Sequence, residues 1–268
     1  GYFKPDFINP ENNKGNITLL ELLTHTSVIP SLLDLFLYAR NPEDMLLAIR
    51  RCVNRTDSPA VVKYTCEGYI LLGTIIAAID GVPLEELIRR RVLEPLGMKD
   101  TGYRPAPALL DRIAPTEYSA WRGRMVRGQV HDENAVVMGE VSGNAGIFST
   151  AGDLARVAEM MLRRGNEGGF LHPATVEKMT INYTPGKGQN RGLGWLLAGP
   201  AAPAGDLMSP RSFGHTGFTG TSIWVDPEYG LYGVLLANRV HPSRENAKFF
   251  RVRSIFHNLI ILNYGGRN

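Results

Sequence analysis

Residues 214–225 read GHTGFTGTSIWV, a glycine-flanked turn followed at once by an alternating apolar segment. Glycine lets other atoms approach the main chain closely, so a His and a Thr held between glycines can offer backbone N–H groups and a hydroxyl to an anionic ligand. On spacing alone, glycines beside a strand more often mark a bulge or a tight turn. The stretch therefore predicts a strand that ends in a turn, and chemistry at that turn is the sharper hypothesis.

The hydrophobic pattern around this stretch has the period of two that is typical of β-strands. It begins after Gly192, where short aromatic and β-branched segments are separated by turn signals such as Asp226, Pro227 and Gly230. Such a pattern predicts successive antiparallel strands. The predicted strands lie in the segments GLGWLLA (192–198), RSFGHTG (211–217), TSIWVDP (221–227) and LYGVLLA (231–237).

Helical periodicity dominates the chain before Gly192. The predicted helices cover residues 17–26, 42–51, 67–79, 84–96, 149–164 and 173–179, and a closing helix covers 244–262. Asn16 and Asn41 are the expected caps of the first two helices. Residues 103–149 are rich in Gly, Pro and Arg without sustained periodicity, so long loops are expected there.

A helix-rich first part followed by a strand meander and a closing helix predicts an α+β architecture. We expect residues 1–185 to form a mainly helical lobe with long loops, and residues 186–268 to form an antiparallel sheet with the C-terminal helix. A chain of 268 residues suits one large domain or two intimate ones. A protein of this size typically buries roughly 70–75% of its unfolded surface, so a real core is expected.

The composition excludes several classes of function. A net charge of +3 is too small to indicate nucleic acid as the main partner, and the basic clusters have no interleaved aromatic platform. Two cysteines, Cys52 and Cys66, are too few for a disulfide framework or a zinc site, and the six histidines form no close pair. No metal and no cofactor is expected. No apolar run approaches the roughly 20 residues that span a bilayer.

Four segments, in this order, carry a resemblance to a known family. They are ITLLELLTHTSVIP (17–30), YTCEGYILLGTIIAAIDGVPLEELIRRRVLEPLGMKDTGY (64–103), HDENAVVMGEVSGNAGIFSTAGDLARVAEMML (131–162) and FGHTGFTGTSIWVDPEYGLYGVLLANRVHP (213–242). Together they resemble the serine β-lactamases of class C type and their penicillin-binding and esterase relatives. The resemblance implies an antiparallel sheet flanked by helices, a helical lobe, and an active site in the cleft between them.

Members of this family use three elements: a Ser-x-x-Lys helix start, a Tyr-x-Asn or similar loop, and a Lys/His-Thr-Gly strand. Tyr64, Thr65 and Cys66 resemble the second element. By that resemblance Tyr64 is expected to share protons with the Lys and the Ser, first as general base and then as general acid. From spacing alone, Tyr64 would be read as a half-buried aromatic residue.

His215, Thr216 and Gly217, near the start of the stretch 214–225, resemble the third element. His215 stands where Lys is more usual, and either residue can help Thr216 to recognise a carboxylate. Gly217 would let the substrate approach the strand, and the backbone N–H of Phe218 would form one half of an oxyanion hole.

Cys66 departs from the family pattern, which has Asn, Asp or Ser at this position. Those residues offer hydrogen bonds to the Lys amine and to the substrate amide, whereas a thiol is a weak donor and acceptor. Cys66 as a replacement nucleophile is a second idea. Nothing close to it in sequence obviously lowers its pKa, so this idea is disfavoured.

The Ser-x-x-Lys element is missing from this sequence, since no Ser has a Lys three residues later; Ser119 with Arg122 comes nearest. In relatives this element lies a few dozen residues before the helix that matches 17–26, where this chain has only sixteen residues. We therefore expect the chain to be the C-terminal part of a longer hydrolase. Its N-terminal strands and nucleophile helix would be absent, or supplied by a partner subunit or a swapped copy.

The sequence thus predicts a serine hydrolase that forms an acyl-enzyme with a β-lactam, a D-Ala peptide or an ester. Its geometry would require Tyr64 and the His215 strand to face each other across one crevice. The alternative is a non-catalytic ligand-binding or interaction protein with the same fold, and a third possibility is an inert fragment. The compartment is unknown from the residues; the resemblance implies the periplasm, the cell envelope or the extracellular space.

Overall fold

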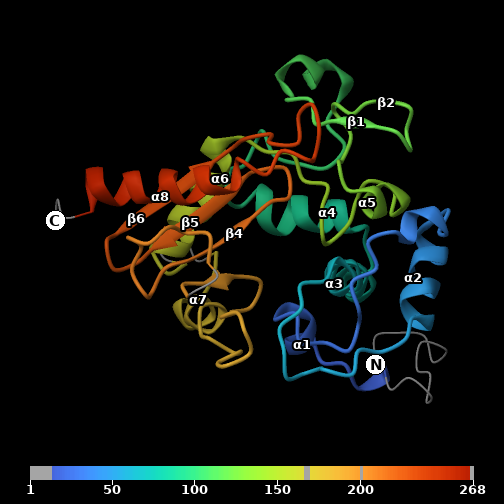
Figure 1. The fold of residues 1–268 in the computed structure, drawn as a ribbon, viewed down its shortest axis with the longest axis horizontal. Coiled ribbons are helices and arrows are strands. Elements are labelled where there is room, and N and C mark those ends of the chain that lie inside the picture. The colour runs from blue at the N-terminus through green and yellow to red at the C-terminus, as the bar shows by residue number, and fades with distance from the viewer. Residues whose placement is uncertain (1–13, 166–169, 200–201, 266–268) are drawn as a thin grey trace. The chain divides into compact units, whose positions relative to one another are not determined.

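The computed structural model describes residues 14–165, 170–199 and 202–265. The chain forms two compact units (Figure 1). The first contains the residues up to 92, with 102–105 and 129–148, and the second contains 93–101, 106–128 and the residues from 149 onward. The residues before 14, which include most of the short N-terminal stretch considered above, lie outside the described part.

The first helix is shorter than predicted and has a different cap. A short 3₁₀ turn, η2 (Lys14–Asn16), precedes helix α1 (Leu19–Leu23), whose N-cap is Thr18 and not Asn16. The Thr18 hydroxyl accepts from the Glu21 N–H (3.2 Å), and the Glu21 carboxylate accepts from the Thr18 N–H (2.8 Å). This reciprocal capping box satisfies two donors that the helix itself leaves unpaired, so the helix begins after Thr18.

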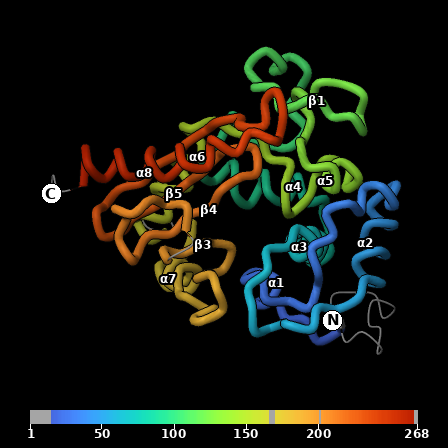
Figure 2. Tube along the Cα trace, viewed as in Figure 1, coloured from blue at the N-terminus to red at the C-terminus, as the bar shows by residue number. Residues whose placement is uncertain are grey.

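Two further helices of the first unit match their predictions. Helix α2 (Pro42–Arg51) is capped by Asn41, whose side chain accepts from the Asp44 N–H, as the sequence predicts. Helix α3 (Cys66–Asp80) is apolar on most of its circumference and ends at Gly81 in the left-handed region. Figure 2 labels these three helices along the chain trace. They supply most of the buried core of this unit: Leu22 from α1, Met45 and Ile49 from α2, and Ile70, Leu71 and Ile75 from α3.

The remaining elements of the first unit lie partly in segments predicted as loop. Helix α4 (Leu84–Ile88) continues as the π-helical turn η4 (Arg89–Leu93), and η3 (Leu35–Leu37) is a single 3₁₀ turn. Helix α5 (Glu133–Val137) forms within the expected loop 103–149, because Asp132 caps it by accepting from the Ala135 N–H (2.7 Å). In the second unit that loop also holds η5 (Pro107–Arg112) and a hairpin of β1 (Tyr118–Ser119) with β2 (Arg124–Met125).

The second unit is built on a four-stranded antiparallel sheet in the order β3-β4-β5-β6. All four predicted strands form, and each is shorter than its apolar segment: β3 (Leu196–Leu197), β4 (Phe213–Thr216), β5 (Ser222–Asp226) and β6 (Leu231–Leu235). His215 pairs with Ile223 and Thr216 with Ser222, so the His-Thr pair stands directly at the turn between β4 and β5.

Helices cover both faces of this sheet. Helix α6 (Ala151–Leu162), capped by Thr150, and α7 (Pro173–Met179) pack against Phe213 and Val225. Helix α8 (Phe250–Tyr264) places His257 against Ser222 and Trp224, which alternate with Val225 and therefore face the other way. Since α6 and α7 belong with the sheet, the two units differ from the expected division at residue 185. The helices and antiparallel sheets confirm the α+β class.

Helix α8 begins six residues later than the predicted start at 244. The guanidinium of Arg239 donates to the carbonyl oxygens of Arg244 and Asn246, both at 2.9 Å. Arg244 in turn pairs with Glu117, whose carboxylate also accepts from the Arg244 N–H (2.7 Å). These side-chain bonds hold the segment in an irregular path, so the helical pattern of the sequence takes effect only from Phe250.

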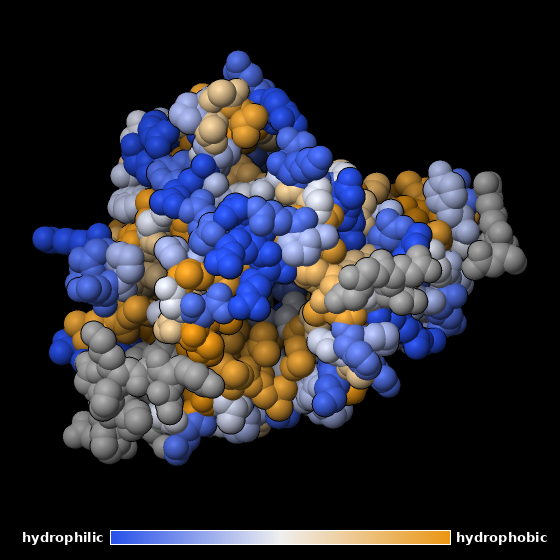
Figure 3. Space-filling view, turned by 180° about the vertical axis from the view of Figure 1, so that it is seen from behind, coloured by the Kyte–Doolittle hydropathy of each residue, from blue (hydrophilic) through white to orange (hydrophobic). Residues whose placement is uncertain are grey.

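Within the described ranges, every helix is too short or too polar to cross a lipid bilayer. The same ranges contain no group of three or more His, Cys, Asp or Glu side chains able to hold a metal ion. Figure 3 shows hydrophobic areas interrupted by hydrophilic ones on the face seen from behind.

Candidate active site

Tyr64 lies immediately before helix α3 in the first unit, with 48% of its surface exposed. The buried residue His25 holds the backbone on both sides of it. The Lys63 N–H donates to the His25 carbonyl oxygen (2.9 Å), and the Thr65 N–H donates to His25 Nδ1 (3.2 Å). The rings of His25 and Tyr64 lie 4.4 Å apart between centroids. The phenol is thus presented at the surface on a backbone that a buried imidazole fixes.

Sequence reasoning missed this role of His25, which it treated as one of six scattered histidines. Its Nδ1 accepts a hydrogen bond, so the proton of the neutral ring sits on Nε2. Its φ of 57° places it in the left-handed region that non-glycine residues seldom occupy. No spacing rule would find this residue, because its partners lie about forty positions further along the chain.

Cys66 is the first residue of helix α3, and its thiol is partly buried. Burial raises the pKa of Cys66 to about 12, and the nearby carboxylates of Asp132 and Glu67 act in the same direction. The thiol is therefore protonated at neutral pH. Because the thiolate is the nucleophilic form, these surroundings disfavour Cys66 as a replacement nucleophile.

Glu67 adds a buried carboxyl group beneath the first turn of α3. Its Oε1 accepts from the Leu32 N–H (2.8 Å), whereas its Oε2 is buried and has no hydrogen-bond partner among the described residues. Burial is the main cause that raises the pKa of Glu67, and the charge of Asp132 raises it further. The surroundings of the Tyr64 segment are therefore rich in carboxyl groups.

His215 lies on strand β4 of the second unit and makes two hydrogen bonds through its ring. Its Nδ1 is 3.0 Å from the Thr216 carbonyl oxygen, and its Nε2 is 3.4 Å from Nη1 of Arg191. A carbonyl only accepts and a guanidinium only donates, so the neutral ring carries its proton on Nδ1. Burial, followed by the charge of Arg191, lowers the pKa of His215 to about 4. The imidazole is thus neutral at pH 7, and Arg191 carries the charge at this position.

The turn after His215 and Thr216 depends on Gly217. The Gly217 N–H donates to the Thr221 carbonyl oxygen (2.8 Å), and the Gly217 carbonyl oxygen accepts from the Gly220 N–H (3.1 Å). A Cβ atom at position 217 would lie 2.3 Å from Thr221 Oγ1. A larger residue at position 217 would therefore force the Thr221 hydroxyl to rotate away from the turn.

Two buried arginines hold the carbonyl oxygens of this turn. Arg253, from α8, donates to the carbonyl oxygens of Gly217 and Gly220, and Arg239 donates to that of Phe218 (2.9 Å). Because a trans peptide is planar, the Phe218 N–H points opposite to the Gly217 carbonyl and so away from Arg253. Arg253 thus orients the peptide whose N–H, by the resemblance, is expected to form one half of an oxyanion hole.

The charge of this region is strongly positive. Arg191, Arg239 and Arg253 are each only 5% exposed. Throughout the described part of the chain, neither Arg239 nor Arg253 has a carboxylate partner. Desolvation, followed by the charge of Arg239, lowers the pKa of Arg253. Buried cations are normally paired with anions, so this arrangement is suited to an anionic ligand at the turn.

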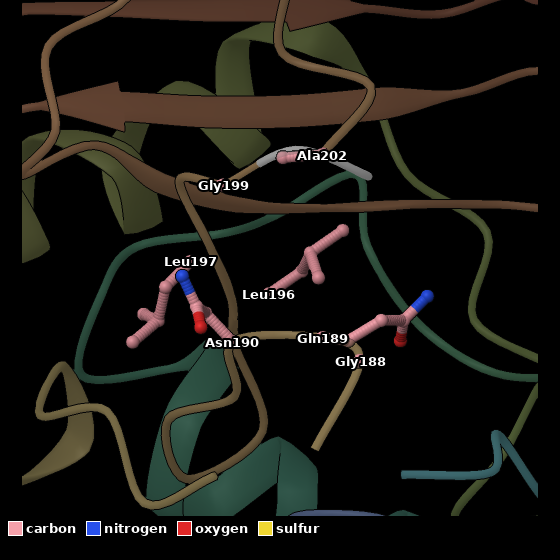
Figure 4. Close-up of a pocket in the computed structure, with 7 residues that line it drawn as sticks. All are labelled: Gly188, Gln189, Asn190, Leu196, Leu197, Gly199 and Ala202. Carbon is pink, nitrogen blue, oxygen red and sulfur yellow. The ribbon is translucent and has the colours of Figure 1, made fainter. Parts of the chain in front are cut away.

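A small cavity lies next to this region (Figure 4). It encloses about 20 Å³, which is room for a single water molecule. Its lining includes Gln189, whose side-chain oxygen accepts from Arg191 (2.9 Å). The cavity is too small for a peptide or a β-lactam.

The predicted site residues therefore fall into two groups. The first unit holds Tyr64 and Cys66, and the second holds His215, Thr216, Gly217 and Phe218. Within each group the residues are close neighbours in sequence. The roles of these residues remain predictions.

Comparison with known proteins adds three findings. A family model described as Beta-lactamase matches residues 5–255. An Escherichia coli K12 protein named "Putative D-alanyl-D-alanine carboxypeptidase" is 30% identical over 88% of this chain and 61% of its own length, and a Salmonella enteritidis protein of the same name is 34% identical over 69% and 47%. The chain thus spans about half to three fifths of the length of these curated relatives.

The fold is also similar to that of solved structures. A penicillin-binding protein homologue from Caulobacter crescentus superposes with a TM-score of 0.71 at 19% identity, covering 95% of this chain and 73% of the other. At this level of identity the likeness concerns the fold alone.

Proposed function

Because the chain belongs to the β-lactamase family, we propose that it carries two of the three elements of a serine acyl-transfer hydrolase. The loop at Tyr64 would supply proton transfer, and the strand at His215 would bind and polarise the substrate. The third element, a Ser-x-x-Lys segment, would come from a longer polypeptide, a partner subunit or a swapped copy.

In this proposal the Ser hydroxyl attacks the substrate carbonyl carbon and loses its proton to the Tyr64 phenolate, which the Lys ammonium would stabilise. The negative charge that develops on the carbonyl oxygen would meet the Phe218 N–H, whose direction Arg253 sets. Tyr64 then gives the proton to the leaving nitrogen as the carbon–nitrogen bond breaks. Water repeats the sequence on the acyl-enzyme and releases the acid.

The observation that carries the proposal furthest is the pair of buried guanidiniums behind the His-Thr-Gly turn. They favour a substrate with a carboxylate near the bond to be broken, such as a peptide ending in D-Ala-D-Ala or a β-lactam, over a neutral ester. The first of these fits the name that the Escherichia coli and Salmonella relatives bear. A peptide substrate of this kind would place the protein in the periplasm or the cell envelope.

Calorimetric binding tests this choice of substrate. An N-acylated peptide ending in D-Ala-D-Ala should bind at least about tenfold more tightly than the same peptide with a C-terminal carboxamide, because one charge-assisted contact is worth about 1.5–3 kcal/mol. Arg191→Gln should weaken binding of the acid, whereas Arg211→Gln, an exposed control beyond the other end of β4, should not. Equal affinity for acid and amide would contradict the proposal and favour a neutral ester.

A second candidate is a non-catalytic ligand-binding protein, which the lack of a Ser-x-x-Lys pattern in these residues favours. Incubation with a fluorescent penicillin separates the two. Covalent labelling of the longer polypeptide that includes this chain supports the hydrolase, and reversible binding alone supports the binding protein.

A further inference from the structure

The turn after strand β4 carries an exposed aromatic ring on the same residue whose N–H would bind the oxyanion. This residue is Phe218, and 58% of its surface is exposed. A single exposed apolar side chain is ordinary on a protein surface, so exposure alone gives it no role. The contacts of the ring and of its backbone are what distinguish it.

Two guanidinium groups hold the Phe218 ring in place. The Cζ atoms of Arg239 and Arg244 lie 4.7 and 5.8 Å from the ring centroid. Arg239 is itself tethered to the carbonyl oxygen of Asn246 (2.9 Å). Arg244 is tethered to the buried carboxylate of Glu117 (2.6 Å). An exposed ring between fixed neighbours loses little freedom when a ligand packs on it, so it is preorganised for binding.

The backbone of Phe218 is fixed from the same side. Arg239 donates from Nε to the Phe218 carbonyl oxygen (2.9 Å) and from its backbone N–H to that of Thr219 (2.7 Å). Arg253 holds the carbonyl oxygen of Gly217, on the preceding peptide. The N–H and the ring of Phe218, which only the Cα and Cβ atoms separate, are therefore held as one unit.

The proposed function fixes the direction in which a substrate lies along this turn. The substrate carboxylate would lie at Thr216 and Arg191, and the reacting carbonyl oxygen would lie at the Phe218 N–H, two positions further along the chain. The leaving group, which bears the carboxylate, then lies before Phe218. The acyl part of the substrate continues past it, on the side where the ring stands.

We propose that Phe218 is a specificity-determining residue whose ring packs against an apolar group, above all an aromatic one, in the acyl part of the substrate. This inference rests on the acyl-transfer function proposed above and names a feature of its substrate. Contact between two aromatic rings is favourable beyond the area that it buries. The charges of Arg239 and Arg244 beside the ring disfavour a cationic group at the same place.

Calorimetric binding of two peptides tests this inference. N-phenylacetyl-D-Ala-D-Ala should bind about three- to tenfold more tightly than N-acetyl-D-Ala-D-Ala, the usual contribution of one aromatic pair. Phe218→Ala should reduce this preference to less than about twofold, and Phe218→Tyr, which restores a ring, should keep it. The measured quantity is the ratio of the two affinities. A merely structural role of Phe218 would weaken the binding of both peptides and leave that ratio unchanged.

A matched control removes the other ring that Arg239 covers. The Cζ atom of Arg239 also lies 4.7 Å from the ring centroid of Phe250, on α8, so Phe250→Ala disturbs the same guanidinium and should keep the preference. Should Phe218→Ala not fold, Phe218→Ser, a residue common in turns, replaces it in the same scheme.

The possible results separate this inference from the function on which it rests. Equal affinity of the unchanged protein for the two peptides overturns this inference alone. The same holds if the preference persists in Phe218→Ala, or if Phe250→Ala abolishes it as well. Failure of the unchanged protein to bind either peptide overturns the proposed function and this inference with it.

Discussion

The two groups of site residues lie in opposite electrostatic surroundings. Around Cys66, two positions after Tyr64, the neighbours are the carboxyl groups of Glu67 and Asp132, and the thiol itself stays protonated. Around His215 the neighbours are buried arginines, and the imidazole itself is neutral. The site residues of the first unit thus lie in surroundings that favour neutral or cationic groups. Those of the second unit lie in surroundings that favour anions.

This difference assigns separate tasks to the two units. Carboxyl groups near Cys66 are suited to stabilise a cation, such as the Lys ammonium that the resemblance implies for the missing element. Arginines near the His-Thr-Gly turn are suited to a substrate carboxylate and to the oxyanion. Proton transfer and anion binding would then be supplied by different parts of the chain, and each can be perturbed without the other.

Removing the Tyr64 phenol should have the largest effect. In a polypeptide that includes the Ser-x-x-Lys element, Tyr64→Phe should slow acylation by about 10²–10⁴-fold, the usual contribution of a general acid–base group. The affinity for the peptide acid should change little, because the arginines of the other unit are intact. Stopped-flow acylation and calorimetry measure the two quantities separately.

Tyr69→Phe is the matched control for this change. Its hydroxyl donates to the Leu23 carbonyl oxygen (3.0 Å), so its loss should affect stability and leave acylation within about threefold. If Tyr64→Phe acylates at the normal rate, or weakens binding as strongly as it slows acylation, the division of tasks is wrong.

The two units should respond to acid in opposite directions. In the second unit the pKa values of His215 and of buried His257 are lowered to about 4, from a model-peptide value of 6.5. Arg253 and the Ser222 hydroxyl face His257, and Arg191 faces His215. The unfolded chain then binds more protons between pH 6.5 and 4, so the stability of this unit is full above pH 6.5 and is lost as the pH falls.

In the first unit the pKa of Glu67 is raised, so the folded state binds the extra proton. Its stability contribution is full below the unfolded value of 4.5 and is lost as the pH rises through the folded pKa. Hydrogen exchange followed peptide by peptide between pH 7 and 4 should show protection falling in the sheet and rising in α3. Glu67→Gln should abolish the rise in α3, and parallel changes in both units would contradict the argument.

A smaller effect is expected from Arg253→Met, which keeps the length of the side chain and removes its charge. The carbonyl oxygens of Gly217 and Gly220 would lose their buried donor, at a cost of about 1–3 kcal/mol in the free energy of unfolding. The affinity for the peptide acid should fall as well. Urea unfolding measures the first effect, and Arg251→Met, its exposed neighbour on α8, should stay within about 0.5 kcal/mol.

Local patterns predicted most of the secondary structure. Helix α2 has its cap, its first-turn acids and its last-turn arginines in consecutive residues, and its bounds were predictable from them. The start of α8 was not, because Arg239 takes the carbonyl oxygens of Arg244 and Asn246 out of the helical pattern. Helix α5 was missed because its signal is a single cap, Asp132, in a segment without periodicity.

The candidate site divides in the same way. Tyr64 and His215 stand in short motifs and could be found by resemblance. His25 and Arg253 could not, since each acts on a residue about 36 to 40 positions away and only the folded chain brings them together. Short motifs therefore indicate which groups are candidates for the reaction. The residues that position these groups and set the local charge can be identified only from the packing of the folded chain.

The smallest effect should come from Cys66→Ser. This change tests whether the Cys66 thiol of the first unit takes part in the reaction. A protonated thiol takes no part in bond making, so a hydroxyl of similar size should leave acylation within about threefold. If Cys66 were the nucleophile, the same change would remove the reactive thiolate and slow the reaction by orders of magnitude. Cys52→Ser is the matched control, because its thiol donates to the Ile49 carbonyl oxygen (3.0 Å) away from the Tyr64 loop. A large loss of acylation rate in Cys66→Ser, without a loss in Cys52→Ser, would assign covalent chemistry to the first unit in place of proton transfer.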